Sequence, residues 1–303
     1  MIRIGSRGSQ LALWQAHWIE ARLNALGETC RIEVIKTSGD KITDVPLAQA
    51  GGKGLFTKEI EDALLAGSID VAVHSLKDMP TGLPDGLALA AIPEREDVRD
   101  ALIGRRLADL PRAAVVGTSS LRRSAQLRAM RPDLRIATLR GNLDTRLRKL
   151  DEGQYDAIVL AAAGLRRLGW AGRIAELVPV EISCPAAGQG ALAVETRASD
   201  GHAARLCAQL DHGPSRAAVT AERAALAILG GNCQVPIGAY ADAAGGLLRL
   251  RAVVTAPDGS QAVRGEESGP DSQAEAVGRT LSERLLRDGA REILAAVNAS
   301  SVT

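Results

Sequence analysis

A carboxylate follows directly after a short apolar segment in the stretch Ile69–Pro80, whose sequence is IDVAVHSLKDMP. The segment Ile69–Val73 is rich in β-branched residues, which is typical of a buried parallel strand. Ser75, Lys77 and Asp78 come next, at the carboxyl end of that strand, where open α/β sheets bind ligands. Asp78 is therefore the first candidate for electrostatic or acid–base chemistry. A carboxylate that only caps a turn fits the same pattern, and the spacing leaves both interpretations open.

A second set of candidates is strongly basic. Between Arg112 and Lys149, nine arginines and one lysine stand against two aspartates, which gives this segment a local net charge of +8. The planar guanidinium group binds carboxylate or phosphate through two parallel hydrogen bonds, so the clustering favours a cleft that holds a small polyanion. A solvated basic face or a nucleic-acid surface is the alternative. The arginines gather after three expected strands, as the pairs Arg122 and Arg123, Arg140 and Arg146, and Arg166 and Arg167.

Loops with glycine and hydroxyl residues supply further anion contacts. Arg7 and Ser9 lie in a turn before an expected helix, where backbone N–H groups favour anions. Lys53 lies in the sequence GGKG, which is not a Walker A loop but brings a cation and backbone N–H groups together. The sequence Thr118-Ser119-Ser120 precedes another expected helix and suits a helix cap.

Cysteine and histidine positions limit the other kinds of chemistry. Cys233 lies in a glycine-rich loop outside any apolar stripe, and it is either a buried structural thiol or an exposed thiol for covalent chemistry. The four cysteines are far apart and form no CxxC pair, which fits a reducing cytoplasm. The four histidines lack metal-ligand spacing with the cysteines or with one another, so we expect no metal.

Composition sets the bounds for these interpretations. A chain of 303 residues with 46% hydrophobic and 24% charged residues is long enough for two or three globular domains. The formal net charge of +1 gives no overall field for nucleic acid or membrane. The chain has one Phe, two Tyr and three Trp, too few for base-stacking platforms. No apolar run reaches the about 18 residues of a membrane span, and we do not expect the opening sequence MIRIGSRGSQ to be a signal peptide.

The elements that position these residues alternate between strands and helices, which predicts α/β units with parallel strands. The charged run Glu94–Asp100 is expected to be a linker between two such units. The expected strands of these units are 3–4, 31–37, 69–73, 87–92, 113–116, 135–139, 155–161 and 191–195. The expected helices are 10–26, 57–66, 121–131, a helix ending near 152, and 203–210. A helix over 215–229, strands over 235–240, 247–255 and 261–267, and helical segments over 272–298 then predict a small α+β domain.

Eight segments in order resemble the porphobilinogen deaminase family, also called hydroxymethylbilane synthases. They are SRGSQLALWQA, GGKGLFTKE, DVAVHSLKDMP, VGTSSLRRSAQL, LRGNLDTRL, AAAGLRRLG, PAAGQGALAVE and CQVPIGAY. The resemblance implies an α/β fold with two periplasmic-binding-protein-like lobes and a small C-terminal α+β domain with a three-stranded antiparallel sheet. It implies three domains: 1–95 with 190–212, 96–189, and 213–303.

The resemblance also implies roles for single residues. Asp78 would be the catalytic carboxylate, and Cys233 would carry a dipyrromethane cofactor through a thioether. Asn232 stands where the family has glycine, and Asn tolerates a left-handed backbone better than other non-glycine residues. The other residues implied to hold the cofactor are Ser75, Lys77, Thr118, Ser119, Ser120, Arg122, Arg123, Arg140, Arg146 and Gly190. Those implied to hold the substrate are Arg7, Ser9, Gln15, Lys53, Phe56, Arg167 and Gln189.

The implied activity is a transferase of haem biosynthesis that joins four porphobilinogen molecules head to tail, releases ammonia, and hydrolyses the product to hydroxymethylbilane. Porphobilinogen carries an acetate and a propionate, which fits the basic cleft. Two other functions are alternatives: a solute-binding protein of the same architecture, disfavoured by Cys233, and a single-stranded nucleic-acid binder, disfavoured by the few aromatics. We expect a cytoplasmic monomer with a small-molecule partner and neither nucleic-acid nor membrane partners.

Overall fold

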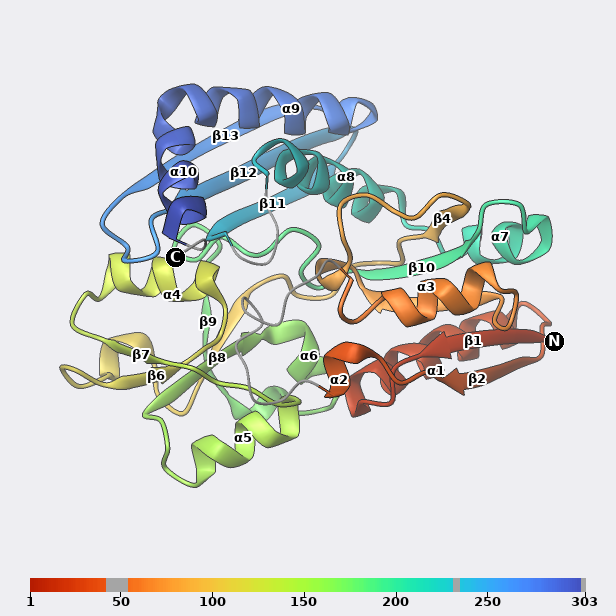
Figure 1. The fold of residues 1–303 in the computed structure, drawn as a ribbon, viewed down its shortest axis with the longest axis horizontal. Helices are drawn as coiled ribbons and strands as arrows, with labels where there is room; N and C mark the ends of the chain where they lie inside the picture. Colours follow the sequence, from red (N-terminus) through yellow and green to blue (C-terminus); the bar gives the residue numbers. More distant parts are fainter. Residues whose placement is uncertain (42–53, 231–234, 301–303) are drawn as a thin grey trace.

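The computed structural model describes residues 1–41, 54–230 and 235–300, which form two α/β lobes and a C-terminal domain (Figure 1). In the first lobe a five-stranded sheet has the order β2-β1-β3-β10-β4. Strand β1 is parallel to both of its neighbours, whereas β10 is antiparallel to β3 and β4. The strands are β1 (Ile2–Ser6), β2 (Cys30–Val34), β3 (Val71–Ser75), β4 (Leu87–Ala91) and β10 (Leu192–Arg197).

Helices cover both faces of this first sheet. Ala16, Ile19 and Leu23 of α1 pack with Val71 and Val73 on one face. Ile60 and Leu64 of α3 pack with Ala72 on the other, because successive strand residues point to opposite faces. The helices of this lobe are α1 (Gln10–Ala25), α2 (Ser38–Lys41), α3 (Lys58–Leu65) and α7 (Gly201–Ala208), with a 3-10 turn η1 (Leu76–Asp78).

The second lobe repeats this plan with the order β7-β6-β8-β5-β9. Strand β6 is parallel to its neighbours β7 and β8, and β5 is antiparallel to its neighbours β8 and β9. The strands are β5 (Asp100–Ile103), β6 (Val115–Gly117), β7 (Arg135–Ala137), β8 (Ala157–Ala161) and β9 (Ile174–Val178). The helical elements are η2 (Leu107–Asp109), α4 (Leu121–Met130), α5 (Leu143–Asp151), α6 (Ala162–Arg167) and η3 (Ala171–Arg173).

The C-terminal domain packs helices on one antiparallel sheet of order β11-β12-β13. Its strands are β11 (Ile237–Ala244), β12 (Leu247–Thr255) and β13 (Ala262–Pro270). Its helical elements are α8 (Gly213–Ile228), η4 (Asp271–Gln273), α9 (Ala274–Leu285), η5 (Leu286–Ala290) and α10 (Arg291–Ser300). The predicted fold class of two α/β lobes and a small α+β domain is therefore confirmed.

The chain crosses between the lobes twice, in segments 92–99 and 179–191, and the two crossings touch. Glu96 N–H donates to the carbonyl of Gly190 at 3.2 Å. Gly190 has a φ of +86°, and a Cβ there would lie 2.4 Å from the Glu96 carbonyl oxygen. Glycine is therefore required at this contact between the crossings. The division 1–95 with 190–212, 96–189, and 213–303 stays a proposal.

Several element boundaries were predicted wrongly. The predicted linker Glu94–Asp100 does connect the two lobes, but its last residue, Asp100, begins β5 and is fully buried. Strand β9 and helix α6 were not expected as regular elements. Strand β3 begins at Val71 rather than Ile69. The backbone N–H of Asp70 donates to the Arg3 carbonyl, and the Asp70 carboxylate accepts the Arg3 N–H, so Asp70 holds the turn before the strand.

One buried ion pair joins the C-terminal domain to both crossings. Glu222 of α8 accepts hydrogen bonds from Arg95 Nη1 at 2.6 Å and Arg95 Nη2 at 3.0 Å. The same carboxylate accepts the N–H groups of Gly188 and Ala241, each at 2.7 Å. Arg95 lies on the first crossing, Gly188 on the second and Ala241 on β11, so a single carboxylate orders three segments.

We therefore predict that Glu222→Gln destabilises the protein strongly. The substitution keeps the shape but leaves the Arg95 charge buried without a counter-ion, which costs about 3–5 kcal/mol of unfolding free energy. Denaturant unfolding of the parent and the variant measures this difference. Glu152→Gln is the matched control: it breaks the exposed pair of Glu152 with Arg148 and should cost only about 0–1 kcal/mol. Equal losses in the two variants would contradict the prediction.

Candidate active site

Asp78 lies at the end of the 3-10 turn η1, directly after β3, as the sequence predicts. Leu76 and Met79 are buried on either side and anchor the turn, while Asp78 is exposed and Lys77 is half-buried. Pro80 follows and prevents a longer helix. Gln15 Nε2, on α1, donates to the Ser75 hydroxyl at 2.9 Å, so a buried amide fixes the last residue of the strand.

Cationic side chains from both lobes interact electrostatically with one another and with Asp78. Burial lowers the pKa of Lys77 to about 8, with Asp78 opposing and Arg123 adding to the shift. Burial also lowers the pKa of Arg146 to about 10, where Arg123 and Arg140 add to the shift and Asp78 again opposes it. Lys77 and Asp78 belong to the first lobe and the three arginines to the second. The structure thus brings five of the predicted site residues into one electrostatic cluster.

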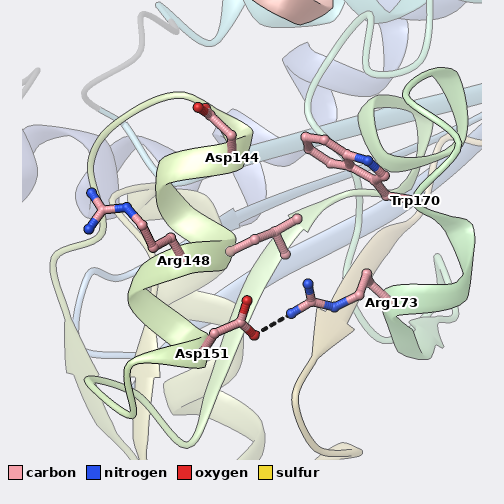
Figure 2. Close-up of a pocket in the computed structure, with 6 residues that line it drawn as sticks. Asp144, Arg148, Asp151, Trp170 and Arg173 are labelled. Carbon is pink, nitrogen blue, oxygen red and sulfur yellow. Dashed lines mark hydrogen bonds and ion pairs between the residues drawn. The ribbon is translucent and has the colours of Figure 1, made fainter.

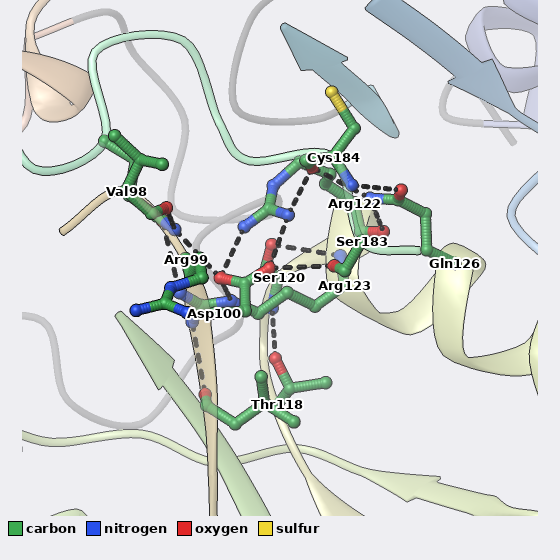
Figure 3. A network of polar contacts seen from close by, with 12 residues as sticks. Val98, Arg99, Asp100, Thr118, Ser120, Arg122, Arg123, Gln126, Ser183 and Cys184 are labelled. Carbon is green, nitrogen blue, oxygen red and sulfur yellow. Dashed lines mark hydrogen bonds and ion pairs between the residues drawn. The ribbon is translucent and has the colours of Figure 1, made fainter. Parts of the chain in front are cut away.

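Arg122 and Arg123, at the start of α4, are buried and bind Asp100 (Figure 3). Arg122 donates to the two Asp100 carboxylate oxygens at 2.7 and 3.0 Å, and Arg123 Nε donates at 2.8 Å. Burial alone would raise the pKa of Asp100, but Arg122 and Arg123 outweigh it and hold that pKa far below its usual range. The sequence analysis did not identify Asp100 as a site residue. The excess of arginines between Arg112 and Lys149 could have suggested it, because buried arginines need a carboxylate partner.

The arginine pair keeps binding capacity beyond these contacts. Two guanidinium groups and one carboxylate carry a net charge of +1. Arg122 Nε is buried and has no hydrogen-bond partner among the residues that the structure describes. A buried donor without an acceptor costs free energy, which a ligand carboxylate would relieve. The donor set therefore fits a polycarboxylate such as a dipyrromethane.

The predicted hydroxyl contacts before α4 mainly hold the loop. Ser119 Oγ donates to the Leu139 carbonyl at 2.7 Å and accepts the Leu139 N–H at 3.1 Å. Ser120 Oγ caps α4 by accepting the Arg123 N–H at 3.4 Å, and Thr118 Oγ1 accepts the Ser120 N–H at 3.2 Å. Side-chain caps of this kind fix the first turn of a helix, so these residues position the arginine pair.

Arg7 and Phe56 lie together at a second place in the first lobe. The Arg7 guanidinium stacks 4.2 Å from the centre of the Phe56 ring and forms an ion pair with Asp40 at 2.5 Å. Ser9 caps α1 by accepting the Ala12 N–H at 3.3 Å. The predicted substrate contact at Lys53 and the predicted attachment at Cys233 lie outside the described residues.

Arg167 and Gln189 lie next to the crossings between the lobes. Arg167 Nη2 donates to the Gly190 carbonyl at 2.6 Å, and burial lowers its pKa to about 10. Gln189 is fully buried, and its side-chain N–H group donates to Val98 O at 2.7 Å and Asp100 at 3.0 Å. The structure therefore places Gln189 within the Asp100 network and does not bring its amide to an open surface.

A separate pocket of about 330 Å³ lies between α5 and η3 (Figure 2). Trp170 and Leu147 form its apolar wall, and its arginines already have partners: Arg173 pairs with Asp151 at 2.5 Å and Arg148 with Glu152 at 2.7 Å. None of the predicted site residues lines it. The pocket is not the place where those residues meet.

Comparisons with known proteins identify relatives of the chain. A family model described as porphobilinogen deaminase, dipyromethane cofactor binding domain, matches residues 2–205, and one described as porphobilinogen deaminase, C-terminal domain, matches residues 216–287. A protein named porphobilinogen deaminase from Geobacter metallireducens is 52% identical over 300 residues, covering 98% of this chain and 94% of that protein. Its namesake from Pelobacter propionicus is 54% identical over 297 residues, covering 97% and 96%.

Solved structures that resemble the chain include two solute-binding proteins. A periplasmic substrate-binding protein of an ABC transporter from Coxiella burnetii has a TM-score of 0.43 and 14% identity, covering 71% of this chain and 93% of its own. The second substrate binding domain of a putative amino acid ABC transporter from Streptococcus pneumoniae has a TM-score of 0.43 and 13% identity, covering 69% and 91%. None of the helices in the described part of the chain has the length and apolar character of a membrane crossing.

The lowered pKa of Lys77 leads to a testable prediction. Modification of amines by an acylating reagent requires the neutral form, so Lys77 in the ligand-free protein should react with a midpoint near pH 8. Asp78 raises this pKa, so Asp78→Asn should move the midpoint to lower pH. Peptide mass mapping after modification at a series of pH values measures both midpoints. An unchanged or higher midpoint in Asp78→Asn would show that the two groups do not interact.

Proposed function

Because the chain belongs to the porphobilinogen deaminase family, whose members are transferases, we propose that it deaminates four porphobilinogen molecules and joins them head to tail. The product released by hydrolysis would be hydroxymethylbilane, a precursor in tetrapyrrole and haem biosynthesis. The observation that carries this proposal is the cluster of Lys77, Arg123, Arg140 and Arg146 around one exposed carboxylate, Asp78. A cluster with excess positive charge suits a substrate that carries two carboxylates on every ring.

The cationic residues bind and orient the acidic side chains. Arg140, Arg146 and Lys77 would neutralise acetate and propionate groups near Asp78, and Arg7 with Phe56 would bind the incoming substrate. Arg7 is held by Asp40, so a substrate carboxylate would share or replace that partner. Partly buried guanidinium groups hold carboxylates more tightly than exposed ones do, because water competes less. The remaining substrate contacts that we propose are Ser9, Gln15, Lys53 and Arg167.

Asp78 would stabilise the positive charge that develops on the substrate. Loss of the aminomethyl nitrogen as ammonia leaves a cation that is spread onto the pyrrole nitrogen. A carboxylate near the pyrrole N–H favours that cation by charge and by hydrogen bonding. After the carbon–carbon bond forms, one ring proton must leave, and Asp78 is the exposed carboxylate in the cluster that can accept it.

The family model describes a dipyromethane cofactor binding domain, and we propose that Cys233 attaches this cofactor through a thioether. The bound cofactor supplies the free pyrrole α-carbon to which the first substrate is added. The residues that would hold its acidic groups are Ser75, Lys77, Thr118, Ser119, Ser120, Arg122, Arg123, Arg140, Arg146 and Gly190. Burial raises the pKa of Cys184 and of Cys207 to about 12, so these two thiols are poor nucleophiles, which supports Cys233.

We also propose that the protein acts as a monomer in the cytoplasm. Cys30, Cys184 and Cys207 are free thiols, and a reducing compartment keeps thiols in that form. Sedimentation of the loaded protein would test the monomeric state.

The first prediction from this mechanism concerns the charge of Asp78. Asp78→Asn keeps the size but removes the charge, and loss of one preorganised electrostatic group costs about 10²–10³ in rate. Asp78→Glu keeps the charge but moves it by one methylene, so it should retain more activity than the Asn variant. Single-turnover release of ammonia at equal cofactor occupancy measures both rates. An Asn variant as fast as the Glu variant would remove Asp78 from the mechanism.

The second prediction concerns the attachment residue. Cys233→Ser should yield a folded, inactive protein whose intact mass lacks two pyrrole units. Cys30→Ser is the control, because Cys30 is a half-buried thiol at the start of β2 in the first lobe. This control should keep the added mass and the activity. Peptide mapping that finds the adduct on any other cysteine would contradict the assignment.

A further inference from the structure

We propose that Asp100 is a positioning residue: it holds Arg122 and Arg123 in the orientation in which their remaining N–H groups bind a carboxylate of the cofactor. It also links that orientation to both segments that join the lobes. This inference rests on the proposed function, because it assumes that the arginine pair binds the cofactor. It adds a role for a residue that touches neither cofactor nor substrate and acts only through the two arginines.

The contacts of Asp100 come from two other parts of the chain, the start of α4 and the second crossing (Figure 3). Its two carboxylate oxygens accept five hydrogen bonds, three of them from Arg122 and Arg123. The other two come from Ser183 Oγ at 2.9 Å and Gln189 Nε2 at 3.0 Å, both on the second crossing. Asp100 itself begins β5 at the end of the first crossing. A carboxylate oxygen accepts about two hydrogen bonds, so Asp100 has little capacity left for any other donor.

The arginine side chains are fixed by these contacts and by the carbonyls around them. Arg122 Nη1 also donates to the Cys184 carbonyl at 2.7 Å, and Arg123 Nη1 donates to the Val159 carbonyl at 3.1 Å. Arg123 Nη2 lies 3.3 Å from Gln189 Oε1. Cys184 and Gln189 lie on the second crossing, so a change in that crossing would move the groups that accept from the arginines relative to α4. The guanidinium groups would have to move with them, so the arginine orientation depends on the geometry of the crossings.

The charge balance explains why this position holds a carboxylate. Two buried guanidinium groups without a counter-ion would repel each other and lose their hydration. Asp100 removes one of the two charges and leaves a net charge of +1, which matches a single ligand carboxylate. A neutral residue at 100 would leave +2 in a buried place, and an orientation that exposes the arginines to water would then be favoured.

Stability and cofactor loading separate this role from a purely structural one. Asp100→Asn should lower the melting temperature and reduce the fraction of protein that carries the two-pyrrole mass at least tenfold. The double variant Asp100→Asn with Arg122→Gln restores the net charge of the cluster to +1, so its melting temperature should recover. Its loading should stay at least tenfold below the parent because Arg122 itself is missing, so this variant tests the charge balance, and Asp100→Glu, which keeps both arginines, tests the positioning. Loading that recovers together with stability would overturn the proposal.

Two further variants complete the test. Asp133→Asn is the control, because it breaks another aspartate–arginine pair of the same lobe, with Arg131 at 2.7 Å, and should leave loading unchanged. Asp100→Glu keeps the charge and displaces the carboxylate by one methylene, so it is informative even if Asp100→Asn does not fold. It should load several-fold less than the parent, and loading equal to the parent would overturn the proposal. A parent protein without any pyrrole mass would contradict the proposed function and this inference with it.

Discussion

A single buried carboxylate, Asp100, meets both segments that connect the lobes and the first turn of the helix that carries Arg122 and Arg123. Buried guanidinium groups are stable only when a carboxylate and carbonyl groups satisfy them, so burial of these arginines requires Asp100 at this place. The arrangement of the lobes and of the crossings therefore depends on balancing the charge of the buried arginine pair. In the same way, Glu222 of the C-terminal domain balances the charge of the buried Arg95.

The topology explains why the crossings lie beside the site. Each sheet contains one antiparallel strand that follows directly after a crossing: β5 in the second lobe and β10 in the first. Strand β10 lies beside β3, whose carboxyl end leads into the turn that carries Asp78. Strand β5 lies beside β8 and starts at Asp100. The returning strands therefore lie next to the parallel strands β3 and β8, which lead into the turn with Asp78 and into α6.

Local sequence patterns predicted correctly the residues whose position depends on the element just before them in the chain. Asp78 follows a buried apolar strand, and the arginines follow strands, so the strand-end rule placed them correctly at sheet edges. Asp100 could not be found in this way, since its charged run Glu94–Asp100 has the composition of an exposed linker. Its partners lie 22 to 89 residues away, and the partner of Arg95 lies 127 residues away. Burial of a charge depends on such distant partners, which spacing in one sequence does not reveal.

The proposed site would hold many carboxylates, yet excess positive charge cannot be buried without a penalty. The structure meets these two demands in different places. Arg122 and Arg123 are buried and share Asp100, so that pair carries only one net charge. Lys77 and Arg146 remain half-buried with lowered pKa values, and Asp78 partly offsets their repulsion. A carboxylate that binds here would raise these pKa values, so ligand binding and protonation of Lys77 would reinforce each other. Asp78 stays exposed because the cations around it, and not Asp78, occupy the more buried positions.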